Sequence, residues 1–148
     1  MSLEKYDFRH TSDYTRFEFV SIGRKGSIIK VIEYAQISEN PPIYNLGFGD
    51  KNVLTGQIDD LIVSDNGDSK KGLATGAETV YLFTEHNKKA GVFLTGSTPS
   101  RTRLYQIGIR RFISIIEADF YIHALNSDNE WESFQKERRY EAFLVIRK

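Results

Sequence analysis

Small polar residues and arginines are concentrated in one short stretch of the sequence. Gly96, Ser97 and Thr98 form a small-residue turn, and Arg101 and Arg103 follow closely after it. Where such a turn leads a strand into a helix, the first backbone N–H groups of the helix lack partners and can bind an anion. Arginine side chains add planar guanidinium groups that suit phosphate and carboxylate. These five residues therefore form a predicted anion-binding site.

The elements on both sides of this turn follow from residue spacing. The apolar run Gly91–Leu94 predicts a strand. Pro99 suits the first position of a helix, because the N–H that it lacks would be unpaired there, and Thr98 then becomes the N-cap. Apolar residues continue at helical spacing as far as Ile116, so we expect a single helix over residues 99–116.

A second interpretation of the same arginines remains open. A cation in the first turn of a helix faces the positive end of the helix dipole, so a negative group should lie close to Arg101. That group is either a bound phosphate or carboxylate, or a carboxylate of the acidic segment 50–68, which contains five Asp and one Lys. Plain solvation of the arginine is the remaining alternative. The turn lacks the glycine patterns of nucleotide-binding loops, so the sequence does not identify a ligand.

Residues that could catalyse a reaction are few. The absence of cysteine excludes a thiol nucleophile and a thiolate zinc site. Tyr121 and His123 share one face of a predicted strand, which is either a plain structural pair or a source of acid and base groups. His123 with Arg101, Arg103 and Tyr105 would suit RNA cleavage, but 20 Lys and Arg balance 20 Asp and Glu, whereas RNA binding favours a basic excess. No reaction is assigned, and binding is favoured over catalysis.

Composition sets further limits. A chain of 148 residues with 40% hydrophobic and 27% charged residues predicts one folded domain, residues 1–148. No apolar stretch approaches the roughly 20 residues of a membrane span, and no apolar signal region begins the chain, so we expect a cytoplasmic protein without a membrane partner. The aspartates lack the spacing of a calcium loop and the three histidines are far apart, so no metal or cofactor is expected.

The order of predicted elements defines the fold class. Strands and helices are expected at Arg16–Ile22, Ser27–Ile37, Tyr44–Asp50, Ser69–His86, Gly91–Leu94, 99–116, Asp119–Leu125 and Tyr140–Ile146, with Asp68 as the N-cap of the first helix. This order predicts an α+β domain, with a largely antiparallel sheet and two helices packed on one face.

Two glycines inside the first predicted helix call for an explanation. Gly72 and Gly76 lie one turn apart, and each costs about 0.8–1 kcal/mol relative to alanine in a helix interior. Gly47 and Gly49 leave one face of a predicted strand bare. We therefore expect the helix glycines to mark a close contact with another element.

Five segments together resemble a known protein family. They are YNLGFGD (44–50), DDLIVSDNGD (59–68), LATGAETV (73–80), GSTPSRTRLY (96–105) and the terminal YEAFLVIRK. With these segments the chain resembles a family of small bacterial proteins of unknown function, over nearly its whole length. The resemblance implies a single domain in a bacterial cytosol, and it brings no activity, cofactor or catalytic residue.

The favoured function is a bacterial module that binds an anionic ligand, either a phosphate-bearing small molecule or nucleic acid, at the turn Gly96–Arg103. A protein-interaction or structural module with no small-molecule site is the first alternative, and a homodimer is compatible with the sequence. An RNA-cleaving, toxin-like enzyme is the second alternative.

Overall fold

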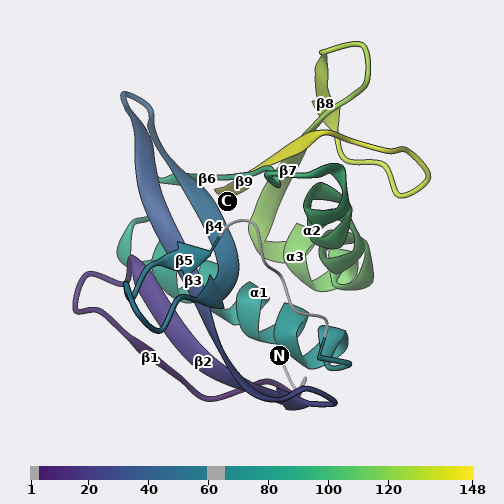
Figure 1. Ribbon diagram of the computed structural model, residues 1–148. Coiled ribbons are helices and arrows are strands. Elements are labelled where there is room, and N and C mark those ends of the chain that lie inside the picture. The colour runs from purple at the N-terminus through teal and green to yellow at the C-terminus, as the bar shows by residue number, and fades with distance from the viewer. Residues whose placement is uncertain (1–3, 60–65) are drawn as a thin grey trace. The chain divides into compact units, whose positions relative to one another are not determined.

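The computed structural model describes residues 4–59 and 66–148 (Figure 1). Its strands are β1 (Phe8–His10), β2 (Arg16–Gly23), β3 (Gly26–Glu39), β4 (Pro42–Lys51), β5 (Ile58–Asp59), β6 (Gly91–Leu94), β7 (Phe120–Leu125), β8 (Trp131–Ser133) and β9 (Ala142–Arg147). Its helices are α1 (Ser69–His86), α2 (Pro99–Arg111) and α3 (Ile113–Asp119). None of the helices in this part of the chain is long and apolar enough to cross a membrane.

The strands form one sheet, and the α+β class is confirmed. The strand order is β1-β2-β3-β4-β6-β9-β7-β8, with β5 paired to β4. β4 and β6 run parallel, with Ile43 opposite Gly91. The pairs β1–β2, β2–β3, β4–β5, β6–β9, β7–β9 and β7–β8 are antiparallel, so the sheet is largely antiparallel as predicted.

Residue contacts divide the chain into two compact units. Unit 1 contains the described residues up to Ala35 together with those of Gly47–His86, and unit 2 contains Gln36–Leu46 and Asn87–Lys148. Each unit has its own buried core, and each is described by itself below.

The core of unit 1 lies between the β2–β3 hairpin and α1. Phe17 and Phe19 are buried on alternate positions of β2, as a half-buried strand requires. Tyr34 of β3 stacks on Phe83 of α1 with ring centroids 4.2 Å apart, and its hydroxyl contacts the Thr79 hydroxyl at 2.9 Å. The strands predicted at Arg16–Ile22 and Ser27–Ile37 are confirmed and pair with each other, and the predicted helix Ser69–His86 is also confirmed.

A buried asparagine holds the turn of this hairpin. Asn66 is 1% exposed, and its Nδ2 donates to the carbonyl of Ser21 at 3.3 Å and to that of Gly26 at 2.9 Å. Its Oδ1 accepts the N–H of Lys25 at 2.6 Å. A Cβ at Gly23 would lie 1.9 Å from the Asn66 carbonyl oxygen, so only glycine fits this position without a shift of the backbone.

Asp68 precedes α1 as predicted, but its carboxylate has a different role from helix capping. The carboxylate accepts the hydroxyl of Tyr6 at 2.6 Å and that of Ser21 at 2.5 Å. Its backbone carbonyl bonds to the helix, accepting the N–H of Gly72 at 3.0 Å. Asp68 therefore connects β2 and the N-terminal segment at the point where α1 begins.

The prediction that Gly72 and Gly76 mark a close contact is wrong. A Cβ at Gly72 would meet no described atom within 4 Å, and one at Gly76 would meet only Ile32 Cδ1, at 3.9 Å. That distance is ordinary van der Waals contact. Helical spacing placed both glycines on one face, but spacing does not show how close the neighbouring element comes.

Unit 2 is built on β6, β9, β7 and β8. Residues alternate between buried and less buried along β7 and β9, and α2 and α3 lie beside β7 (Figure 1). The buried residues of the covered face are Val92, Leu94, Phe120, Ile122, Ala124, Phe143 and Val145.

The helix expected over residues 99–116 is two helices. Phe112 separates α2 from α3, with φ −107° and ψ 17°, outside the helical range. Its side chain is 4% exposed, and its carbonyl accepts the N–H of Ile115 at 3.0 Å and that of Ile116 at 2.9 Å. The break is one residue long and its apolar side chain is buried, so the helical spacing of apolar residues continues from α2 into α3. The described chain therefore has three helices where two were predicted.

Replacing Asn66 with alanine should destabilise unit 1. Ser21 lies in the core and would lose its amide partner, and a buried polar group left unpaired costs about 1–3 kcal/mol. Urea unfolding of Asn66→Ala, followed by circular dichroism, measures this loss. Lys25→Ala is the control, because it keeps the backbone N–H that Asn66 accepts. Equal stability of Asn66→Ala and wild type would contradict the role of Asn66.

Replacing Gly76 with alanine should stabilise the protein. The position has room for a Cβ, and glycine costs about 0.5–1 kcal/mol relative to alanine inside a helix. Thermal unfolding of Gly76→Ala should therefore give a higher Tm than wild type. A lower Tm would indicate that Gly76 lies in the close contact that was predicted from the sequence.

Candidate anion-binding site

The turn before α2 has the predicted cap. Thr98 is extended, with φ −134° and ψ 159°, and its hydroxyl oxygen accepts the N–H of Arg101 at 3.3 Å. Pro99 is the first helical residue. The N–H of Gly96 donates to the Thr102 hydroxyl at 2.9 Å, and a Cβ at Gly96 would lie 2.4 Å from Arg101 Cβ. The turn therefore folds back onto the first turn of the helix, and glycine is required at position 96.

An open pocket of about 660 Å³ lies at this turn, within unit 2. Of the predicted site residues, Gly96, Ser97, Thr98 and Arg103 line the pocket, and Arg101 does not. The pocket extends along α2 and is closed on the other side by the segment that leads into β9. The remaining lining residues are Thr95, Pro99, Ser100, Thr102, Gln106, Ile107, Arg110, Ser127, Arg139, Tyr140 and Glu141.

Several donors in the pocket have no partner in unit 2. Among its described residues, no group accepts the backbone N–H of Thr98 or of Ser100. Arg103 is exposed, and its guanidinium forms no hydrogen bond or ion pair within the unit. The first turn of α2 contains no acidic residue. These donors are therefore left unpaired within unit 2.

A buried amide positions the opposite wall of the pocket. Gln106 of α2 is 7% exposed, its Nε2 donates to the carbonyl of Arg138, and its Oε1 accepts the N–H of Tyr140 at 3.1 Å. Arg139, between these two residues, is thus held on both sides. Arg110 Nη2 also donates to the carbonyl of Lys136 at 2.5 Å. The segment is fixed against α2 with Arg139 in the pocket lining.

Glu132 binds two side chains of the same segment, those of Arg138 and Tyr140. Its carboxylate accepts Asn126 Nδ2 at 2.7 Å, the Tyr140 hydroxyl at 3.0 Å and Arg138 Nη1 at 3.0 Å. The hydrogen bond from Asn126, with those from Tyr140 and Arg138, lowers the pKa of Glu132 below its ordinary value of 4.5. Arg138 is therefore neutralised by Glu132, whereas neighbouring Arg139 forms no ion pair within unit 2.

The lining of the pocket carries a net positive charge. Its lining contains three arginines and one carboxylate, Glu141, and no ion pair joins Glu141 to any of them. Helix α2 carries four arginines and no acidic residue. Unit 2 as a whole contains 11 Lys and Arg against 8 Asp and Glu, a formal charge of +3, although the whole chain is neutral.

The pocket contains binding groups and lacks an acid–base pair. Burial raises the pKa of Tyr140, and its hydrogen bond to Glu132 raises it further, so this hydroxyl stays protonated. Neither Tyr105 nor His123 lines the pocket, so of the residues suited to RNA cleavage only Arg103 is present there. Tyr121 is 56% exposed on β7, and His123 lies on the same face of that strand. Among the described residues, no three His, Asp or Glu side chains could hold a metal ion.

Two carboxylates of the acidic segment 50–68 have partners within unit 1. Asp60 and Asp65 lie outside the described residues. Asp50 forms an ion pair with Lys30 at 2.5 Å, and Asp68 accepts the two hydroxyl groups described above. These two carboxylates are therefore already used within unit 1.

Sequence reasoning missed part of the pocket. Arg103, Gln106 and Arg110 recur at spacings of three and four on α2, which is a helical signal for one polar face. No comparable signal marks Arg139, because it is distant in sequence and is brought to the pocket by the Gln106 hydrogen bonds.

These features describe an α+β protein with an arginine-lined candidate anion site at a helix N-terminus. Comparison with protein-family models shows that the chain belongs to a family of unknown function, DUF6934, whose model matches residues 2–148. The expected resemblance to a family of unknown function over nearly the whole chain is thereby confirmed. Searches of curated proteins and of solved structures found no significant match.

The low pKa of Glu132 predicts a pH dependence. A carboxyl group whose pKa is lower in the folded state stabilises that state above its unfolded pKa, and this stabilisation is lost as the pH falls through the folded pKa. Glu132→Gln should therefore lose less stability than wild type between about pH 6 and pH 3. Urea unfolding at several pH values measures the difference. Glu130→Gln, at an exposed neighbouring position, is the control, and identical pH profiles for all three proteins would contradict the role of Glu132.

Proposed function

We propose that this protein binds a phosphate-bearing anion in the pocket at the N-terminus of α2. The observation that carries the proposal is a set of unsatisfied donors in one open pocket. The N–H groups of Thr98 and Ser100 and the guanidinium of Arg103 face no acceptor or carboxylate among the described residues of unit 2.

The electrostatics of α2 support this proposal. Positive charge near a helix N-terminus is unfavourable by about 0.3–1 kcal/mol per exposed charge, and α2 has no acidic residue to offset it. A dianion in the pocket would neutralise Arg103 and accept the free N–H groups at the same time. Charge-assisted hydrogen bonds of this kind are roughly twice as strong as neutral ones.

The chemistry of the lining favours binding over catalysis. Its polar members are arginines, hydroxyl residues, one glutamine, one glutamate and a tyrosine whose pKa is raised by burial. Such groups bind and orient an anion. A proton-transfer step near neutral pH would need a group that titrates there, as histidine does.

The first test is ligand-induced stabilisation. Inorganic phosphate and nucleoside monophosphates should raise the Tm of the wild-type protein, and a ligand at one hundred times its Kd adds about 2.7 kcal/mol of stability. Calorimetric titration gives the Kd directly. Arg103→Gln should weaken binding at least about tenfold, because one charge-assisted contact is lost.

Arg111→Gln is the matched control for the Arg103 variant. Arg111 is an exposed arginine on the same helix and does not line the pocket, so its loss changes the net charge equally and should leave Kd nearly unchanged. Absence of binding by every anion tested would overturn the proposed function. Equal weakening by both variants would assign the effect to net charge instead of the pocket.

A further inference from the structure

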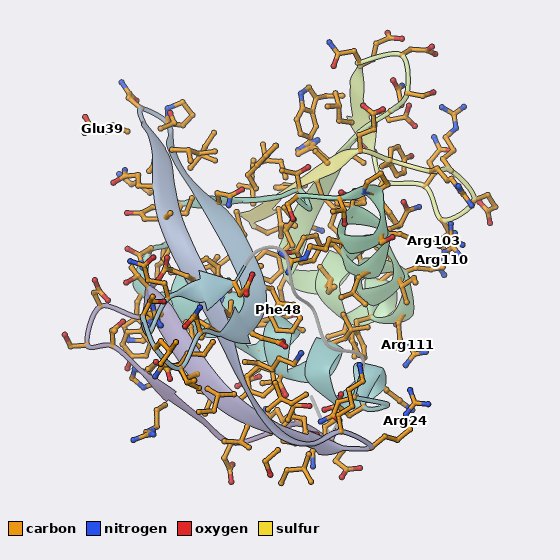
Figure 2. The ribbon with its side chains drawn as sticks, in the orientation of Figure 1. Arg24, Glu39, Phe48, Arg103, Arg110 and Arg111 are labelled. Carbon is orange, nitrogen blue, oxygen red and sulfur yellow. The ribbon has the colours of Figure 1, made fainter. Side chains whose placement is uncertain are left out.

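The groups of α2 that line the pocket extend along the helix from its first turn to Arg110. Arg103 and Arg110 are seven residues apart, which is about 10 Å along a helix and almost two full turns, so both lie on the same side. Both line the pocket, and Figure 2 shows them extending from the same side of α2. Ser100 and Arg110 are separated by about 15 Å along the axis. A phosphate held at Ser100 therefore cannot also contact Arg110.

A third cation lies on the other wall between these two ends. Gln106 is one turn from Arg103 and one turn from Arg110, and it binds the backbone on both sides of Arg139. The lining thus contains Arg103 and Arg110 of α2 and, from the opposite wall, Arg139, whose backbone is held beside Gln106, and each lacks a carboxylate partner in unit 2.

The surface between the cations is apolar. Ile107 lies between Arg103 and Arg110 on α2, is 40% exposed and lines the pocket. An exposed aliphatic side chain flanked by guanidinium groups suits a ligand that alternates anionic groups with less polar ones. A nucleic-acid strand has this pattern, since sugars and bases separate its phosphates.

We propose that the natural ligand is a single-stranded nucleic acid whose sugar–phosphate backbone runs along this groove. This inference rests on the proposed function and specifies its ligand. One phosphate is bound by the Thr98 and Ser100 N–H groups and Arg103, and the following phosphates meet Arg139 and Arg110. A nucleoside triphosphate fits less well, because its phosphates are contiguous and would gather at one end of the groove. Small-molecule sites also enclose most of their ligand, whereas this pocket is only partly enclosed.

The proposal predicts a dependence of affinity on ligand length. Fluorescence anisotropy with oligothymidylates, from a dinucleotide to an octanucleotide, should show affinity rising with length up to about four nucleotides. For the octanucleotide, log K should fall with log salt with a slope of about −2, since each neutralised phosphate of a single strand contributes about −0.7. A hexaglutamate peptide should bind at least about tenfold more weakly, because carboxylates at peptide spacing do not match the three sites.

Variants at the two ends of the groove separate this inference from the proposed function. Arg103→Gln should weaken both phosphate and the octanucleotide. Arg110→Gln should weaken only the octanucleotide and reduce the salt slope by about 0.7. Because Arg110 also bonds to the Lys136 carbonyl, Arg139→Gln provides a second variant whose side chain makes no such bond within unit 2, and it should have the same effect. Arg111→Gln remains the control.

The outcomes distinguish the two claims. Binding of phosphate that depends on Arg103, with no effect of oligonucleotide length and none of Arg110→Gln or Arg139→Gln, would overturn this inference and leave the proposed function standing. Equal affinity for hexaglutamate and the octanucleotide would also overturn it. Absence of binding by phosphate and by all oligonucleotides would overturn both claims.

Discussion

The candidate site depends on one buried amide. Gln106 satisfies a backbone carbonyl and a backbone N–H that flank Arg139, and it does so from the middle of α2. An unpaired buried backbone group costs free energy, so these two hydrogen bonds fix the segment before β9 at one position along α2. The pocket exists because a segment without regular structure is held at a set distance from a helix. Arg103 and Arg139 then belong to one surface, although 36 positions separate them in the chain.

Arg138 and Arg139 are adjacent in the chain, but only Arg138 has a carboxylate partner within unit 2. Arg138 and Tyr140 point their polar groups to Glu132, whereas Arg139 lines the pocket. Glu132 therefore neutralises the arginine that supports the structure and leaves its neighbour charged. A neutral chain can in this way keep a local positive surface, and net charge alone is a poor guide to what such a protein binds.

Local patterns predicted the local structure well. The Thr98 cap, Pro99 as first helical residue and the alternating strands all follow from short-range stereochemistry, and each is present. The failures concern properties that depend on neighbours. Phe112 keeps the apolar period while leaving the helix, and Gly76 has more space than its spacing suggested. Arg139 could not be placed in the site, because its position is set by the hydrogen bonds of Gln106 to the backbone of its neighbours Arg138 and Tyr140, which are 32 and 34 positions from Gln106 in the chain.

The asparagine at the β2–β3 turn bears on how unit 1 folds. The bond from Asn66 to the Gly26 carbonyl spans 40 residues, and that to the Ser21 carbonyl spans 45. A hairpin is normally a local structure that forms in microseconds, but this turn gains its buried partner only when a distant part of the chain arrives. Closing a loop of that length costs entropy before any contact repays it, and such non-local contacts slow folding. The two strands are therefore expected to pair early and to acquire their fixed turn late, in the same step that docks the start of α1.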